Sequence, residues 1–393
     1  MTPEPLQELV ERYDPEVFDA TREETRVRLA TTGDGAADAV IVGGVARLED
    51  ADGDPDAVLT ADAATWRRIA EDVRGGMDAF QRRRLTVRHN LHVGVGFLAA
   101  TSGQDTPGRL EFERADGLSY LQAGVGDPVL LVHGLGGTKV SMLPTVAALA
   151  PQFHAISVDL PGAGDSDKPV GAPYDPRFFA ASLVRFLDAL EIDRAHVVGN
   201  SLGGRVALEL GLRHPERVHR LALLAPSLAW RRDRPWAPVL RLVRPELGLL
   251  QPAPRPVVEG IVRRLIPGGQ DGWSAAGVDE FLRVYQTPRG RAAFYAAARQ
   301  IYLEEPEGDD GFWPRLRTLQ PDALFVWGRN DQIVPLAFAR HVSEAVPGAQ
   351  HVELDCGHVP QLERPAQLHS AITRFLRGAP SQAPARGSRS RAA

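Results

Sequence analysis

Three residues of the sequence have the types and the order along the chain that nucleophilic catalysis requires. Ser201 lies in the motif G-N-S-L-G at 199–203, Asp331 ends the motif W-G-R-N-D, and His358 ends the motif D-C-G-H. A serine hydroxyl attacks a carbonyl carbon when a base removes its proton, and a histidine does this when an acid holds its ring. We therefore predict Ser201 as the nucleophile, His358 as the general base and Asp331 as the acid that orients it.

The residues around Ser201 predict a sharp turn that exposes its hydroxyl. Gly199 and Gly203 flank the serine and allow the chain to pass from a strand into a helix without a Cβ clash. The helix that begins at Leu202 then directs its free N–H groups and the positive end of its dipole toward negative charge beside Ser201.

A second motif, H-G-L-G-G at 133–137, predicts donors for that negative charge. Acyl transfer places a full charge on oxygen in the tetrahedral intermediate, and one preorganised N–H contributes about 3–4 kcal/mol to its stability. We predict that the backbone N–H groups of Leu135 and Leu202 form this oxyanion hole. We expect His133 to brace the loop.

These side chains must be positioned by a sheet, and the sequence from Arg109 onward alternates between strands and helices. Continuous apolar strands separated by helices indicate a mostly parallel sheet with helices on both faces. Ser201, Asp331 and His358 each follow the end of a predicted strand, where ligands bind in such sheets. The predicted strands are 118–123, 128–133, 155–158, 195–198, 221–224, 323–327 and 351–354, and the helices are 140–150, 178–190, 202–212, 336–346 and 366–376.

The alternation stops over residues 226–315, which we call the cap segment. It is rich in proline and carries many apolar side chains, which predict a lid over the site and a hydrophobic small-molecule substrate. These apolar residues are Trp230, Trp236, Leu240, Leu242, Val243, Leu247, Leu249, Leu250, Ile261, Val262 and Leu265.

Together these motifs give residues 109–378 a resemblance to the α/β-hydrolase superfamily, in the branch of capped enzymes. The H-G-x-G loop, the stretch D-L-P-G-A-G-D-S at 159–166 and the elbow G-N-S-L-G-G at 199–204 carry it. The resemblance implies a serine hydrolase that cleaves an ester, thioester or related acyl bond through an acyl-enzyme at Ser201. The elbow is also similar to that of carbon–carbon bond hydrolases, so hydrolysis of a diketone-type metabolite is an alternative. Epoxide hydrolases and haloalkane dehalogenases have Asp at this position, which disfavours those activities.

Residues 1–102 are predicted to form a small α+β domain, joined to the rest by a linker at 103–108. The expected elements are strands at 26–30, 39–48, 58–60 and 85–87, a helix at 61–73 and an apolar stretch at 93–98. Gly43 and Gly44 suggest a bulge or turn within the stretch 39–48. His89 and His92 are expected in a strand, facing opposite ways, which makes them a poor metal pair.

The pattern over residues 21–100 resembles the sterol carrier protein 2 family. Asp54–Asp62, then Trp66 and Ile69, then the stretch 79–87 carry this resemblance. It implies an apolar pocket for a lipid, and a purely structural domain is the alternative. A further possibility is a lipid-binding or transfer protein whose hydrolase half is a non-catalytic scaffold.

Composition excludes several other classes of protein. The net charge of −5 implies no bulk attraction to nucleic acid, and no apolar run approaches the roughly 20 residues that span a bilayer. Cys356 is the only cysteine, so no intramolecular disulfide can form. The first residues lack the apolar core of a signal peptide, and we expect a cytoplasmic protein.

No cofactor or metal is predicted. Gly162 and Gly164 begin a pattern like a dinucleotide loop, but Asp167 stands where its third glycine belongs. The tail at 379–393 has few apolar side chains to bury and is expected to be disordered. The sequence predicts no oligomeric state.

Overall fold

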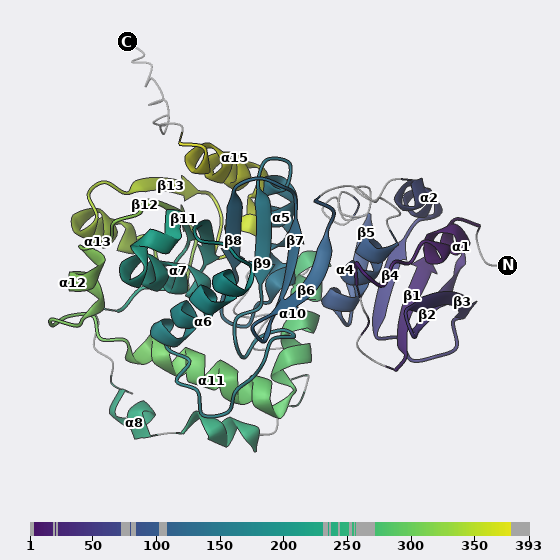
Figure 1. Cartoon of the computed structure of the whole chain (residues 1–393). Coiled ribbons are helices and arrows are strands. Elements are labelled where there is room, and N and C mark those ends of the chain that lie inside the picture. Colours follow the sequence, from purple (N-terminus) through teal and green to yellow (C-terminus); the bar gives the residue numbers. More distant parts are fainter. Residues whose placement is uncertain are drawn as a thin grey trace, which may run out of the picture.

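The protein has two lobes, each built on its own β-sheet (Figure 1). The structure is a computed structural model that describes residues 4–378, apart from 19, 21–22, 72–78, 80–83, 102–107, 231–234, 236, 243, 251–253, 255 and 257–271. We call residues 4–101 the N-terminal lobe and residues 108–378 the C-terminal lobe. No helix within the described ranges is long and apolar enough to cross a membrane.

The C-terminal lobe contains an eight-stranded sheet in the order β13-β12-β11-β10-β8-β9-β7-β6. All neighbouring pairs from β9 to β13 are parallel, whereas β7 pairs antiparallel with both β6 and β9. The predicted fold class is therefore confirmed, with an antiparallel edge. The strands are β6 (Glu111–Ala115), β7 (Leu118–Ala123), β8 (Pro128–Val132), β9 (His154–Val158), β10 (Ala195–Asn200), β11 (Val218–Leu224), β12 (Asp322–Gly328) and β13 (Gln350–Leu354).

Helices cover both faces of this sheet, which explains why its strands are apolar along their whole length. Leu130 and Val132 of β8 belong to the apolar cluster that contains α6 and α7, while Val129 and Leu131 belong to the cluster that contains α5 and α15. The helices outside the cap segment are α5 (Leu143–Leu149), α6 (Pro176–Ala189), α7 (Leu202–Arg213), α13 (Phe338–Ala345), α14 (Pro360–Glu363) and α15 (Pro365–Leu376), with the short 3-10 helices η1 (Lys139–Met142) and η2 (Pro215–Arg217).

The described part of the cap segment is helical and lies between β11 and β12 in the chain. Its helices are α8 (Ala237–Leu242), α10 (Gly272–Tyr285), α11 (Pro288–Leu303) and, at its end, α12 (Phe312–Leu316), with the 3-10 helix η3 (Pro245–Leu249). Five apolar residues assigned to the lid from sequence lie outside the described residues, as do the expected tail and most of the expected linker. These five are Trp236, Val243, Ile261, Val262 and Leu265.

The N-terminal lobe holds a five-stranded sheet in the order β3-β2-β1-β4-β5. The expectation of one strand over 39–48 is wrong in part: Gly43 and Gly44, where a bulge or turn was expected, have φ of 57° and 78° and form a tight turn that separates two antiparallel strands. The elements are α1 (Glu4–Glu11), β1 (Thr25–Thr31), β2 (Gly35–Val42), β3 (Val45–Asp50), β4 (Ala57–Ala61), α2 (Ala63–Glu71), β5 (Leu85–Arg88) and α4 (Leu91–Ala100).

The strand expected around His89 and His92 is also wrong. His89 lies in a turn with a φ of +69°, and His92 lies in the first turn of α4. Asn90 caps this helix, because its side chain accepts a hydrogen bond from the N–H of Val93. The helix is apolar on nearly all sides because most of it is buried, so it has no polar stripe from which a helical period could be read.

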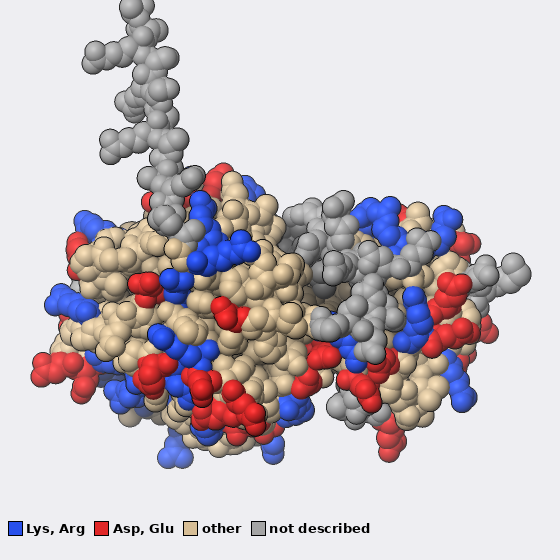
Figure 2. Space-filling model, turned by 45° about the horizontal axis from the view of Figure 1, so that its top comes forward, with Lys and Arg blue, Asp and Glu red and all other residues tan. Residues whose placement is uncertain are grey.

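The two lobes share one apolar core. A single cluster of buried side chains contains Leu29 and Val95 of the N-terminal lobe, Ala276 of α10, and Leu131 of β8. The N-terminal lobe therefore packs as an integral part of the molecule. On the face that Figure 2 shows, acidic and basic side chains are interspersed over both lobes.

A buried carboxylate on α7 gives the C-terminal lobe a pH-dependent contribution to stability. Glu209 accepts hydrogen bonds from Arg205, Arg213 and Arg315 and is fully buried. Burial alone raises the pKa of Glu209, but Arg205 and the other two arginines lower it to about 2. A carboxyl group with a lowered pKa in the folded state stabilises that state above its ordinary pKa, and this stability disappears as the pH falls toward the folded value.

We expect Glu209→Gln to lower the free energy of unfolding at pH 7 by roughly 1–3 kcal/mol, because charged hydrogen bonds are lost. Urea unfolding followed by circular dichroism should show the difference from wild type shrinking below about pH 4.5, the ordinary glutamate value. A difference that stays constant from pH 7 to pH 3 would contradict this account.

Candidate active site

Ser201 lies at the turn between β10 and α7, with a φ of 52° and a ψ of −114°. Such a conformation is strained for a residue with a side chain. The turn is also tight on both sides: a Cβ at Gly199 would meet the carbonyl oxygen of Gly203, and a Cβ at Gly203 would meet that of Val132. The glycines are thus required by space, and the elbow holds Ser201 at the end of the central strands.

Asp331 and His358 are brought together by the ends of β12 and β13. The Nδ1 of His358 donates to Oδ2 of Asp331 at 2.8 Å, and the Asp331 side chain is 0% exposed. The other oxygen, Oδ1, accepts from the N–H groups of Ile333 and Val334 at 2.8 and 2.9 Å. Since Oδ1 is held by the backbone, Oδ2 is fixed toward the ring. A proton on Nδ1 leaves Nε2 of His358 as the acceptor.

Asn200, which precedes Ser201, connects the turn at Ser201 to the loop that carries His358. The Nδ2 of Asn200 donates to the carbonyl of Leu224 at 3.0 Å and to that of His358 at 3.3 Å, while its Oδ1 accepts from Gln361 at 3.2 Å. The Ser201 hydroxyl forms no hydrogen bond with any other described residue. Such bonds are often long in free enzymes and tighten when substrate binds.

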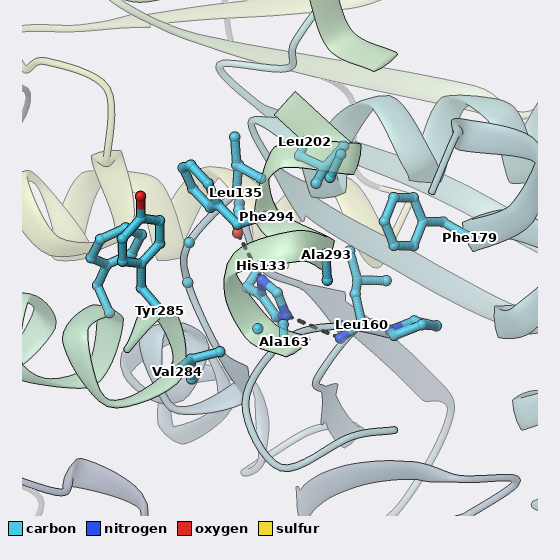
Figure 3. A pocket seen from close by; sticks show the side chains of 18 residues that line it. His133, Leu135, Leu160, Ala163, Phe179, Leu202, Val284, Tyr285, Ala293 and Phe294 are labelled. Carbon is cyan, nitrogen blue, oxygen red and sulfur yellow. Dashed lines mark hydrogen bonds between the residues drawn. The ribbon is translucent and has the colours of Figure 1, made fainter. Parts of the chain in front are cut away.

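His133 braces the loop of the predicted oxyanion hole, as expected. Its Nδ1 lies 2.8 Å from the carbonyl of Gly134, and its Nε2 accepts from the N–H of Leu160 at 3.0 Å (Figure 3). Burial lowers the pKa of His133, so the ring is neutral and can donate at one nitrogen and accept at the other.

The two residues predicted to donate to the oxyanion line one cavity close to Ser201. Leu135 and Leu202 both line it, and neither backbone N–H donates to another described residue. A Cβ at Gly134 would lie 3.2 Å from Cβ of Ser201, so the loop passes directly over the elbow.

A buried lysine that the sequence reasoning missed fixes this loop from below. The Nζ of Lys139 lies 2.7 Å from Asp159 and 3.1 Å from Asp165, and its side chain is almost fully buried. Burial lowers the pKa of Lys139, but Asp159 and Asp165 raise it by more, so the pKa lies above its ordinary value and the ammonium stays charged. The network ties the loop at 133–139 to the loop at 159–166. The available signal was that Lys139 and Lys168 are the only lysines in an arginine-rich chain.

The cavity has a volume of about 40 Å³ and an apolar wall supplied by the cap segment. Phe281 and Tyr285 of α10 and Phe294 of α11 line it together with Leu202, and Figure 3 labels Tyr285, Phe294 and Leu202 among its lining side chains. Tyr285 and Tyr295 share a hydrogen bond of 2.6 Å between their hydroxyl groups. Ser201 and His358 do not line the cavity. Its lining does include Leu202, which follows Ser201 in the chain, and Gly134, which packs against Ser201.

Cys356 lies two residues before His358 but offers no rival nucleophile. The side chain is buried, and burial raises the pKa of its thiol to about 12. A protonated, buried thiol is unreactive.

The strained backbone at Ser201 predicts that a glycine at this position is more stabilising than an alanine. We expect Ser201→Gly to be more stable than Ser201→Ala by roughly 1–2 kcal/mol, because glycine adopts a positive φ without strain. Thermal unfolding of both variants measures this. Equal stability, or a more stable alanine variant, would show that the turn is not strained.

Comparison with known proteins agrees with this fold. The family described as alpha/beta hydrolase fold matches residues 127–365. A 2-hydroxymuconate semialdehyde hydrolase from Pseudomonas sp. (strain CF600) is 30% identical over 279 residues, covering 65% of this chain and 88% of the relative. A 2-hydroxy-6-oxo-2,4-heptadienoate hydrolase from Pseudomonas putida is 28% identical, covering 64% of this chain and 90% of the relative.

Among solved structures, the enol-lactonase from Burkholderia xenovorans LB400 superposes with a TM-score of 0.56 at 23% identity, covering 68% of this chain and 99% of that protein. This similarity concerns the fold. The family match begins after the N-terminal lobe, which it leaves unassigned. With the family matched over more than half of its length, the chain belongs to the alpha/beta hydrolase fold family and is a hydrolase of that fold.

Proposed function

We propose that the protein is a serine hydrolase that cleaves an ester, thioester or related acyl bond with Ser201, His358 and Asp331. The observation that carries the proposal is the 2.8 Å hydrogen bond between His358 and the fully buried, backbone-anchored carboxylate of Asp331. A buried carboxylate is costly unless it is paired, and here it pairs with a histidine whose loop is hydrogen-bonded to the elbow through Asn200.

In the first half-reaction Ser201 Oγ forms a bond to the acyl carbon while its proton passes to Nε2 of His358. The carbonyl oxygen becomes an oxyanion that the N–H groups of Leu135 and Leu202 stabilise. The bond to the leaving group then breaks, and the leaving oxygen or sulfur takes the proton from His358. Ser201 is left as an acyl ester.

In the second half-reaction water replaces the leaving group. His358 takes a proton from the water as its oxygen attacks the acyl carbon, and the same oxyanion hole holds the new intermediate. The bond to Ser201 Oγ breaks, the serine recovers the proton from His358, and the carboxylic acid departs. Asp331 stays ionised throughout and stabilises the imidazolium.

The wall of the cavity favours a hydrophobic acyl group. Phe281, Tyr285 and Phe294 supply aromatic surface, and Ala293 and Ala297 supply small apolar surface. Burial of apolar substrate surface contributes roughly 25 cal/mol per Å².

Hydrolysis of a carbon–carbon bond in a diketone-type metabolite is the second candidate. Its support is that two relatives at 28–30% identity are named as hydrolases of 2-hydroxymuconate semialdehyde and of 2-hydroxy-6-oxo-2,4-heptadienoate. The same three residues would serve that reaction, so the geometry supports both candidates. The hypothesis of a lipid-binding or transfer protein with a non-catalytic hydrolase half is disfavoured, because the chain is an enzyme of this fold.

For the N-terminal lobe, the lipid-binding proposal rests on the resemblance to the sterol carrier protein 2 family. The structural alternative is supported by the packing: Leu29, Leu59 and Phe97 are fully buried and belong to the core shared by both lobes. We favour a structural role for this lobe.

An active-site probe tests the nucleophile directly. A fluorophosphonate should label wild type at Ser201, because Oγ attacks phosphorus and fluoride leaves. Wild type should also hydrolyse p-nitrophenyl butyrate, whereas Ser201→Ala should do neither. Intact-protein and peptide mass spectrometry locate the adduct, and release of p-nitrophenolate measures the hydrolysis.

Ser182, a buried serine of α6, provides a control for serine replacement, since Ser182→Ala should retain labelling. Absence of label on folded wild type would refute the nucleophile. Labelling without ester hydrolysis, together with cleavage of a diketone, would favour the carbon–carbon candidate.

A further inference from the structure

A buried carboxylate of the cap segment accepts hydrogen bonds from the N-terminal lobe. Oδ2 of Asp279, on α10, accepts from Nε of Arg88 at 2.7 Å and from the backbone N–H of His89 at 3.1 Å. The Asp279 side chain is 4% exposed. Figure 1 shows α10 where the lobes meet, and it packs against β5 and α4.

The helix that receives this contact also forms the wall of the cavity on its other side. Residues of an α-helix are separated by about 100° around its axis, so positions 281, 284 and 285 lie roughly 140–240° from position 279. Ala276, one turn before Asp279, is buried in the core shared with the N-terminal lobe. Phe281, Val284 and Tyr285 line the cavity. If the contact of α10 with the N-terminal lobe is altered and the helix moves, the cavity wall formed by its opposite face moves with it.

The contact holds a strained backbone. His89 has a φ of +69°, a conformation that residues with side chains rarely adopt. Its N–H donates to Asp279, a residue 190 positions away in the chain. Strain of this kind persists where the surrounding structure holds it, and it gathers at functional contacts.

A second set of charges fixes α10 to the loop at 159–166. Arg283 donates to Asp165 at 2.8 Å and to Glu280 at 2.7 Å. Asp165 also contacts Lys139, and the Nδ1 of His92 lies 3.6 Å from it. The helix is thus anchored both to the N-terminal lobe, through Asp279, and to the loop at 159–166, through Arg283.

The position of α10 reaches the predicted oxyanion hole through Phe281. A Cβ at Gly136 would lie 2.7 Å from Cδ2 of Phe281, so the ring packs directly on the loop residue that follows Leu135. Gly136 has a φ of +75°, which further limits it to glycine.

We propose that the N-terminal lobe is a specificity-determining clamp: Arg88 and the backbone of His89 hold Asp279, and so fix the aromatic wall of α10 that limits the length of the acyl group. Arg88 and Asp279 are positioning residues, since neither lines the cavity. The catalytic readout of this proposal rests on the proposed serine hydrolase function. The clamp itself is a statement about the position of α10.

Variants of the pair test the clamp through substrate selectivity. With Arg88→Ala or Asp279→Ala, we expect the ratio of kcat/KM for p-nitrophenyl octanoate over acetate to rise roughly tenfold, mainly through KM, as the cavity widens. The kcat for acetate should stay near the wild-type value. The double variant should match the single ones, and Asp279→Asn, which can still accept from His89, should fall between them and wild type.

Arg185 provides a matched control because its Nε also donates to an aspartate, Asp116, at 3.1 Å, and neither residue lines the cavity. The Arg185→Ala variant should keep the wild-type ratio. If Arg88→Ala and Asp279→Ala lower the melting temperature without changing the ratio, or if Arg185→Ala changes it equally, the clamp is refuted.

Hydrogen exchange separates the clamp from the chemistry. In the absence of substrate, peptides covering 275–285 should exchange faster in Arg88→Ala and Asp279→Ala than in wild type or Arg185→Ala. If wild type is not labelled by fluorophosphonate but this exchange difference appears, the proposed function fails and the clamp stands. If esters are cleaved while exchange and selectivity stay unchanged in the variants, the clamp fails alone.

Discussion

A buried carboxylate that must be paired is the constraint on which the site depends. Asp331 has no access to water, so both of its oxygens need partners within the protein. The backbone after β12 occupies Oδ1, and the ring of His358 occupies Oδ2. This arrangement selects one orientation and one tautomer of the histidine. It needs the ends of β12 and β13 to be neighbours, which the parallel pairing of the two strands provides.

The donors predicted for the oxyanion are fixed by the same means, through buried groups that satisfy one another. Lys139 with Asp159 and Asp165 anchors one end of the loop at 133–139, and His133 anchors the other. Donors held in place before substrate arrives need no reorganisation during the reaction, which is what makes them effective. Asp165 belongs also to the network of Arg283, so the cap helix α10 and the loop are held by one set of charges.

The sequence predicted most of the sheet, and the positions of Ser201, Asp331 and His358 after strand ends, because these features depend on local patterns. Strands buried on two faces are apolar throughout, and the elbow around Ser201 requires glycines at fixed positions. The missed features depend on partners distant in the chain: Arg88 and Asp279 are 191 residues apart, and no local pattern relates them. In the N-terminal lobe, α4 was missed because a buried apolar helix has no polar stripe, whereas Gly43 and Gly44 already indicated a bulge or turn within the stretch 39–48.

The rate at which a fluorophosphonate labels Ser201 in Asp331→Asn, relative to wild type, tests the central claim most directly. An amide at position 331 keeps the shape of the side chain but can donate to Nδ1, which favours the wrong tautomer of His358. Circular dichroism should show an intact fold, and the second-order rate constant should fall by roughly 10²–10⁴. A folded Asp331→Asn variant that labels at the wild-type rate would show that Asp331 does not orient the base.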